Sequence, residues 1–295
     1  MIGRLPAEFT LVRLILAGLS VVLLSLVLFS VSLSVLVPTA SAQVLRYGGP
    51  PGTTRTYVRE QRDHVVQTVD GRPTATDIQS YWRLRTRVAA ETTDDLTIGI
   101  VHDSLAITGA PSIGDLGIEA LGRTPIEIVL TRRGAVRELE VPAELTPLTS
   151  RLDLETTYRS FFPRLPETAV VDGLVWSDTT RVATRQNGLD LQVVRVNRYT
   201  SKGWAISGEN RVIRVAYESD LTIEGSGQQQ EAAVALSGSG RATGAFDFDP
   251  RAGAYVGGGE SSTMNMVAIV TSQGQNLVIP IEQNRTETIT SEPSS

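Results

Sequence analysis

Hydrophobic and polar residues alternate along nearly the whole chain after its first forty-odd residues, most clearly between Ile213 and Ile223. There the hydrophobic side chains take odd positions, as Ile213, Val215, Tyr217, Leu221 and Ile223, while polar or charged side chains take most even positions. A period of two is typical of a strand with one buried and one solvated face. The ranges 78–88, 126–130 and 277–281 repeat the pattern. The pattern therefore predicts an all-β protein.

One hairpin can be placed in register from local sequence. Asn187-Gly188 separates two alternating runs, and this dipeptide favours a two-residue type I′ turn. Pairing Gln186 with Leu189 then places three further pairs on one face, Thr184 with Leu191, Val182 with Val193, and Trp176 with Tyr199. A slip of one residue would turn this whole set toward solvent, so we expect the register to be fixed by sidedness.

The first hairpin predicts a mixed face. Asp70-Gly71-Arg72-Pro73 separates the runs 54–69 and 74–90, and its turn places odd residues of the first run beside even residues of the second. Trp82 and Leu84 then share a face with Tyr57, Val65 and Val69, but also with Arg59, Gln61 and Asp63. We expect this face to be partly wet, or else a bulge to switch its sidedness midway.

Helix is scarce. One short helix is expected near residues 150–162, with Thr149 or Ser150 as its cap and Pro163 at its end. The expected architecture is all-β, with long antiparallel hairpins forming a curved sheet, a half-barrel or a sandwich. Its expected parts are an N-terminal β half at 43–165, a C-terminal β half at 166–290 that could share the same sheet, and a disordered tail at 291–295.

The first residues have the features of a secretory signal. Arg4, Glu8 and Arg13 precede an uncharged apolar run from Leu14 through Val37, and the small-residue pattern Ala40-Ser41-Ala42 follows. A signal peptide at 1–42 predicts export to the periplasm or the outside of the cell. The alternative is an uncleaved anchor in the inner membrane through residues 14–37, because about 20 apolar residues span a bilayer core.

Composition narrows the possible partners. Removing residues 1–42 takes away Arg4, Glu8 and Arg13, which changes the balance from 27 basic and 32 acidic residues to 25 and 31, a net charge of −6. This mild acidity argues against a nucleic-acid partner. The chain contains no cysteine, so its core must hold the fold without disulfides.

No constellation of catalytic or metal-binding residues stands out. The only two histidines, His64 and His102, have no second metal ligand at a fixed spacing. His102-Asp103-Ser104 holds the residue types of a hydrolase triad, but neighbours on a strand point to opposite faces. The sequence predicts no enzyme, no cofactor and no metal site. The glycine runs at 225–227, 238–244 and 257–259 are interpreted as bulges or loop tips rather than ligand cradles.

Two sets of residues are candidates for contact with a ligand. The row Arg83, Arg85 and Arg87 could bind an anionic head group, or it could be a solvated strand face. Apolar strand faces could bind an apolar or lipid-like ligand. The residues on these faces are Trp82, Leu84, Trp176, Val182, Val193, Tyr199, Ile213, Val215 and Tyr217.

The C-terminal half carries a resemblance. Its motifs are the segment 240–250 with Phe246-Asp247-Phe248-Asp249-Pro250, then Met264-Asn265-Met266 and Ile279-Pro280-Ile281. Over residues 166–290 this half resembles a family of uncharacterised exported bacterial β-rich proteins, from which no activity is carried over. The long hairpins after a signal peptide are also similar to periplasmic lipoprotein carriers and mycobacterial lipid carriers, whose curved sheet holds acyl chains. The lack of cysteine excludes a lipid-anchored form.

Three functions remain open at this point. The first is a non-enzymatic envelope protein whose curved sheet binds an apolar ligand or another envelope component. The second is a structural or protein-interaction module in which the same faces form closed cores. The third is a hydrolase whose groups assemble from distant segments.

We expect the exported form to begin at Gln43, because a signal peptidase would cut after Ala42. Sequencing the N-terminus of protein recovered from the cell envelope tests this. An intact Met1 in that material would indicate a membrane anchor instead.

Overall fold

The computed structural model describes residues 42–109, 118–145, 148, 152, 154–186, 188–229 and 232–292. The expected signal segment at 1–41 lies outside these residues. They belong to one compact unit, Ala42–Ser295. No helix in the part of the chain that is described has the length and apolarity to cross a bilayer.

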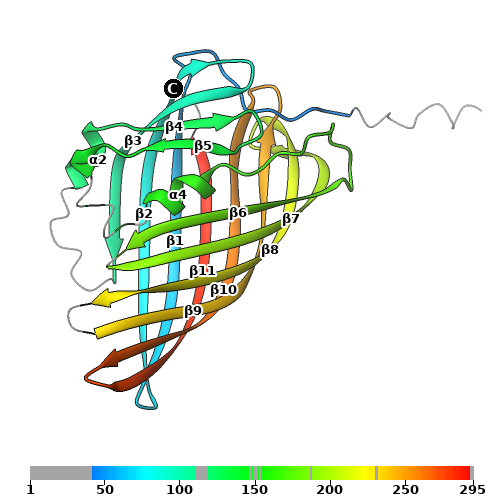
Figure 1. The fold of residues 1–295 in the computed structure, drawn as a ribbon. Coiled ribbons are helices and arrows are strands. Elements are labelled where there is room, and N and C mark those ends of the chain that lie inside the picture. The colour runs from blue at the N-terminus through cyan, green and yellow to red at the C-terminus, as the bar shows by residue number, and fades with distance from the viewer. Residues whose placement is uncertain are drawn as a thin grey trace, which may run out of the picture. The chain divides into compact units, whose positions relative to one another are not determined.

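Eleven antiparallel strands of the described residues form one strongly curved sheet (Figure 1). The sheet order is β5-β4-β3-β2-β1-β11-β10-β9-β8-β7-β6, so every pairing joins sequence neighbours except that of β1 with β11, and β5 does not pair with β6. The described strands β5 and β6 form the two open edges. The strands are β1 Thr54–Val69, β2 Arg72–Glu91, β3 Asp95–Thr108, β4 Ile126–Thr131, β5 Val136–Glu140, β6 Val175–Gln186, β7 Leu189–Ser207, β8 Asn210–Gln229, β9 Ala232–Asp249, β10 Ala254–Ser272 and β11 Gln275–Glu292. The all-β curved sheet predicted from the sequence is confirmed.

Pairing between β1 and β11 joins the two halves of the chain into this one sheet. The register runs from Thr56↔Glu292 to Gln67↔Ile281. Ser291 and Glu292 are therefore strand residues, which corrects the expectation of a disordered tail beginning at residue 291. The pairing ends next to Pro280, which has no N–H to donate, and β11 continues beyond it without β1 as a neighbour.

Both hairpins have the expected sidedness. In β6 and β7 the pairs Val182↔Val193 and Trp176↔Tyr199 confirm the register derived from the Asn-Gly turn. In β1 and β2 Arg59 pairs with Trp82 without a bulge, so the mixed polar and apolar face is real. The concave face of the sheet carries these side chains together with the odd-numbered apolar residues of β8.

A helix lies on the concave side near one end of the sheet (Figure 1). Helix α4, Leu154–Phe161, is the helix expected from the sequence, and its described part begins later than predicted. It contacts both open edges, β5 and β6, so it fills the gap between them. Two shorter elements were not expected, the α2 helix Ile118–Arg123 and the 3-10 turn η1 Ala143–Leu145.

A packed core fills the end of the hollow around α4. The segment before β1 contributes Tyr47, whose ring packs edge-on against Phe248 of β9 at 5.2 Å between centroids. Phe161 of α4 packs in the same way against Tyr57 of β1 at 5.3 Å. Aromatic pairs in this geometry add to the free energy gained from apolar burial. Other buried members of this core are Leu45, Leu84, Ile100, Ile128, Leu130, Tyr158, Ile213 and Val215.

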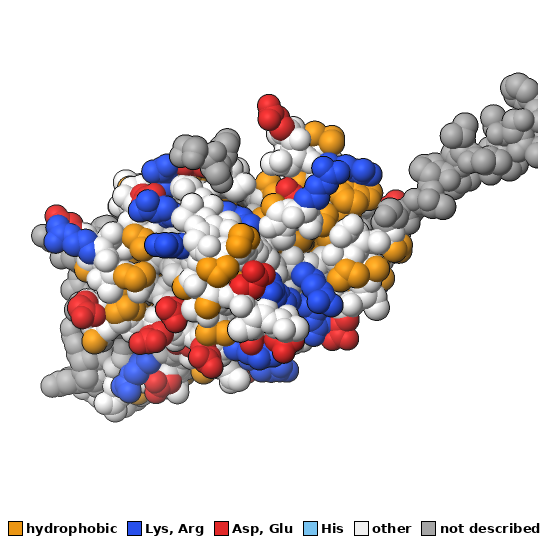
Figure 2. Space-filling model, turned by 90° about the horizontal axis from the view of Figure 1, so that it is seen from above, with side chains coloured by type: hydrophobic (Ala, Val, Ile, Leu, Met, Phe, Trp, Pro, Cys, Tyr) orange, Lys and Arg blue, Asp and Glu red, His pale blue; other side chains and the backbone are white. Residues whose placement is uncertain are grey.

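The convex face is polar and carries both signs of charge. Its ion pairs join Arg83 to Glu292, Arg85 to Asp103 and Arg214 to Asp247. The end of the molecule seen from above also carries interspersed basic and acidic side chains, with hydrophobic patches between them (Figure 2). A surface of this kind is compatible with water, so the concave side is where the fold gathers its apolar side chains.

Truncating a side chain of the packed core should lower the free energy of unfolding far more than truncating one on the outer surface. We expect Leu84→Ala to lower the free energy of unfolding by about 2 to 5 kcal/mol, because Leu84 is 1% exposed. Val278→Ala on the convex face, 53% exposed, should change it by no more than about 0.5 kcal/mol. Urea unfolding followed by tryptophan fluorescence measures both, and equal losses would contradict this placement of the core.

Candidate ligand-binding cavity

A cavity of about 630 Å³ lies between α4 and the concave face, within the size range of small-molecule sites. Helix α4 contributes Thr157, Arg159 and Ser160 to its wall, and the segment after the helix contributes Arg164. The sheet contributes residues from β1, β2, β6, β7, β8, β9, β10 and β11. The cavity is therefore enclosed by segments from nearly the whole described chain.

The wall changes from polar to apolar along β7 and β10, at positions that the register places one inward residue apart. Close to α4 the strands present charged or amide side chains, and farther from it they present aliphatic ones. On β7 Arg195 gives way to Val193, and on β10 Glu260 and Ser262 give way to Met264 and Met266. On β11 Glu287, Arg285 and Gln283 line the polar part. From Ser261 to Ile281 the chain has no charged residue at all. The hollow thus has a polar upper part beneath α4 and an apolar lower part.

The polar part contains a charged belt, which we define as Arg59, Asp63, Arg195, Glu260, Arg285 and Glu287. Arg59 donates to Glu287 at 2.6 Å, and its guanidinium lies 5.5 Å from the ring centroid of Trp82. Arg59 is a buried residue, so its charge depends on this carboxylate and on the aromatic ring rather than on water.

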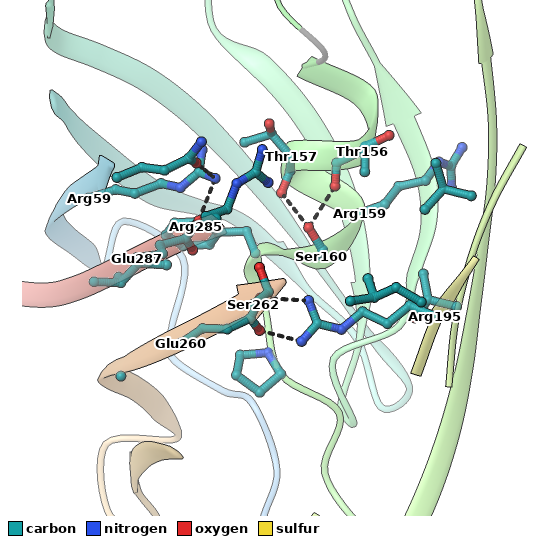
Figure 3. Close-up of a pocket in the computed structure, with 18 of the residues that line it drawn as sticks. Arg59, Thr156, Thr157, Arg159, Ser160, Arg195, Glu260, Ser262, Arg285 and Glu287 are labelled. Atoms are coloured by element: carbon teal, nitrogen blue, oxygen red, sulfur yellow. Dashed lines mark hydrogen bonds and ion pairs between the residues drawn. The ribbon is translucent and has the colours of Figure 1, made fainter. Parts of the chain in front are cut away.

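Arg195 reaches across the hollow from β7 to Glu260 on β10, with Nη1 3.3 Å from the carboxylate Oε1 (Figure 3). Its other nitrogens donate to Asn197 at 2.8 Å and to Ser219 at 3.0 Å. The Tyr217 hydroxyl also donates to Glu260, at 2.8 Å. Burial alone would lower the pKa of Arg195, but the Glu260 carboxylate outweighs it and raises the pKa.

Asp63 forms the third pair of the belt. Its carboxylate accepts from Arg285 at 2.6 Å, from Gln283 at 2.7 Å and from Gln61 at 2.5 Å. Burial acts to raise the pKa of Asp63, but Arg285 and the hydrogen bonds more than offset it, so the pKa lies below its usual value. Asp63 is therefore ionised at neutral pH.

A glycine allows the belt to form. Tyr217, Gly244 and Glu260 are directly opposite one another on β8, β9 and β10. A Cβ atom at Gly244 would stand 2.5 Å from the Tyr217 hydroxyl, so only glycine lets this ring lie across β9 toward Glu260. Gly238 and Gly240 make the same room for Met266 and Met264. The run 238–244 lies inside β9 without a bulge, which corrects its interpretation as a bulge or loop tip.

The roof of the cavity presents hydroxyl groups. Figure 3 shows Thr157 and Ser160 of α4 on the side of the cavity that faces Arg195 and Glu260. Ser160 donates to the Thr156 carbonyl at 2.7 Å, which leaves its hydroxyl oxygen able to accept a further hydrogen bond. Arg159 pairs with Glu155 of the same helix at 3.0 Å.

A buried hydrogen bond of His102 on β3 joins α4 to the sheet. The Nε2 atom of His102 lies 2.7 Å from the Tyr158 hydroxyl, and both side chains are buried. Burial lowers the pKa of His102 to about 4, although Asp103 opposes the shift. His102 and Asp103 point to opposite faces, as expected from the strand, so the three neighbouring residues form no triad. His64 is on the convex face, 2.6 Å from Asp77.

The structure separates the residues predicted to contact a ligand into two groups. Trp82, Val182, Val193, Tyr199 and Tyr217 line the cavity. Leu84, Ile213 and Val215 are instead in the packed core, and Trp176 packs on Tyr199 at 5.2 Å and donates to the Arg164 carbonyl. Arg83, Arg85 and Arg87 are on the opposite, convex face of β2.

Sequence reasoning missed most of the belt. Arg195 ends the apolar series Leu189, Leu191 and Val193 at the inward positions of β7, which is the signal that could have identified it. Glu260 and Arg285 have polar or glycine neighbours at inward positions, and Glu287 follows Arg285, so no comparable signal marks them. Among the described residues no group of three or more acidic or histidine side chains could hold a metal ion.

The pKa of His102 predicts a loss of stability in acid. An unfolded histidine takes up its proton near pH 6.5, whereas folded His102 does so only near pH 4, so stability falls as the pH is lowered between these values. Between neutral pH and about pH 4.5 this contribution is about 2 to 3 kcal/mol. Urea unfolding at both pH values should show a smaller loss in His102→Gln than in the parent protein. Equal losses in the two proteins would contradict the assignment.

No model of a known family matches the chain, and no curated protein matches it. Among solved structures, Pseudomonas aeruginosa OccK2 (OpdF) is 8% identical and covers 82% of this chain and 99% of its own, with a TM-score of 0.21. A loop-deletion mutant of OmpT, an outer membrane protein of Vibrio cholerae, is 9% identical and covers 82% of this chain and 100% of its own, with a TM-score of 0.18. TM-scores this low assign neither a family nor a function.

Proposed function

We propose that this protein is an exported, non-enzymatic protein of the cell envelope that binds an amphipathic, lipid-like molecule. The polar head of the ligand is held beneath α4 at the charged belt, and its apolar part lies along the lower concave face. The observation that carries this proposal is the change of the cavity wall from polar to apolar along β7 and β10.

The geometry of the wall matches such a ligand. Beyond the belt, Val193, Leu221, Ile223, Met264 and Met266 present a continuous apolar surface to the hollow. Burying a ligand's apolar chain on this surface gains about 25 cal/mol per Å² of area removed from water. Above it, arginine, carboxylate and hydroxyl groups offer hydrogen bonds that would fix the orientation of a head group.

The chemistry of the cavity supports binding rather than catalysis. The charged groups of the belt are held in ion pairs, which makes them poor candidates for transferring protons or attacking a substrate. His102 is buried against Tyr158, and His64 is on the convex face beside Asp77. The envelope location is proposed from the expected signal peptide at 1–42, and a curved sheet is what the expected resemblance to periplasmic lipid carriers implies.

We expect Met266→Asp to weaken binding of an uncharged fluorescent apolar probe, N-phenylnaphthylamine, by at least about tenfold, or about 1.4 kcal/mol. The reason is that a carboxylate on the apolar wall would lose hydration when the probe binds. Val267→Asp is the matched control, because Val267 is the next residue of β10 and faces outward with 37% exposure. Fluorescence titration measures both variants.

The outcome also separates this proposal from a closed structural module. A parent protein that takes up no probe, and from which organic solvent extracts no lipid, would contradict ligand binding. Equal weakening by both variants would show that the probe binds somewhere other than the concave face. Thermal unfolding of each variant should show that the fold is retained.

A further inference from the structure

Every arginine on the cavity wall has a carboxylate partner. The pairs are Arg59 with Glu287 at 2.6 Å, Arg159 with Glu155 at 3.0 Å, Arg164 with Asp178 at 3.4 Å, Arg285 with Asp63 at 2.6 Å, and Arg195 with Glu260. Each of the five arginines is thus paired, although Glu155 and Asp178 do not themselves line the cavity. The charged belt holds three arginines and three carboxylates, so it has no net charge to offer a ligand.

These pairs are difficult to separate. The side chains of Asp63 and Glu260 are 7% and 16% exposed, so neither carboxylate can exchange its arginine for water. An anionic head group would have to share a guanidinium with a buried carboxylate, and repulsion between like charges is strong where water is excluded. A cationic head group would meet the equivalent repulsion from the arginines.

A head group without net charge avoids both penalties. The Arg285 side chain is 39% exposed and can donate to a phosphate oxygen, while Glu287, 22% exposed, can face an ammonium group. An uncharged polyol can instead hydrogen-bond to the same groups and to the hydroxyls of Ser160 and Ser262.

We propose that the ligand's polar head carries no net charge, as either a zwitterion or an uncharged polyol. This inference rests on the proposed function, because it specifies the head group of the amphipathic molecule held in that cavity. The arginine row on the convex face differs from the cavity in this respect. There Arg87 has no carboxylate partner among the ion pairs of the described residues.

The test compares amphiphiles that share a dodecyl chain and differ in their heads. Dodecylphosphocholine is zwitterionic, dodecyl maltoside is uncharged, dodecanoate is anionic and dodecyltrimethylammonium is cationic. Each is titrated below its micelle concentration against the parent protein preloaded with N-phenylnaphthylamine. We expect one or both of the first two to displace the probe at concentrations at least about tenfold lower than either charged amphiphile.

Removing one carboxylate should change this preference. Glu260→Gln keeps the size of the side chain but leaves Arg195 without a carboxylate partner, so binding of dodecanoate relative to dodecylphosphocholine and dodecyl maltoside should improve by about tenfold. Glu287→Gln frees Arg59 and serves as a second variant if the first fails to fold. Glu282→Gln is the control, because Glu282 is an exposed residue on the convex face of β11.

The outcomes distinguish the inference from the function on which it rests. If dodecanoate or dodecyltrimethylammonium binds the parent as tightly as the two neutral-headed amphiphiles, the inference is wrong while ligand binding stands. If Glu260→Gln and Glu287→Gln fold but leave the preference unchanged, the inference is also wrong. If no amphiphile displaces the probe and the parent takes up none, the proposed function itself fails. A gap between the zwitterion and the maltoside identifies which kind of neutral head is preferred.

Discussion

Glu260 and Glu287 face each other directly across β10 and β11, on the inner side of the sheet. Two carboxylates in this position repel, so the sheet is stable there only if cations reach them. Arg59 arrives from the adjacent β1, whereas Arg195 arrives from β7, which β8 and β9 separate from β10. Arg195 reaches Glu260 only because the sheet curves, so the curvature and the neutralisation of Glu260 and Glu287 depend on each other. The belt that results lies between the packed core and the open apolar wall.

Much of the architecture could be predicted because strand sidedness is a local property. The alternation at 213–223 placed Ile213 and Tyr217 on the inner face, and the Asn-Gly turn set the register that stacks Trp176 on Tyr199. The mixed face of Arg59, Gln61 and Asp63 was also visible in the sequence. It proved to be part of the cavity wall rather than the result of a bulge.

The site itself could not be predicted, because its partners are distant in the chain. Arg59 and Glu287 are 228 residues apart and meet only because β1 pairs with β11. Arg195 and Glu260 are separated by two intervening strands and meet only because the sheet curves and Gly244 leaves room above β9. Alternation shows which face a side chain occupies, but it carries no information on how strongly the sheet bends.

The stretch of β11 beyond Pro280 has a consequence for behaviour at high concentration. Here β11 has lost β1 as a neighbour, and Val278 and Ile279 place apolar side chains on opposite faces of an open strand edge. Such an edge is a template for intermolecular β-pairing and aggregation. Pro280 removes one backbone donor from it, and the polar turn Ser272-Gln273-Gly274-Gln275 ends the hairpin immediately beyond. A proline at such a position is a feature that opposes edge-to-edge pairing, and here it stands where β11 leaves the protection of β1.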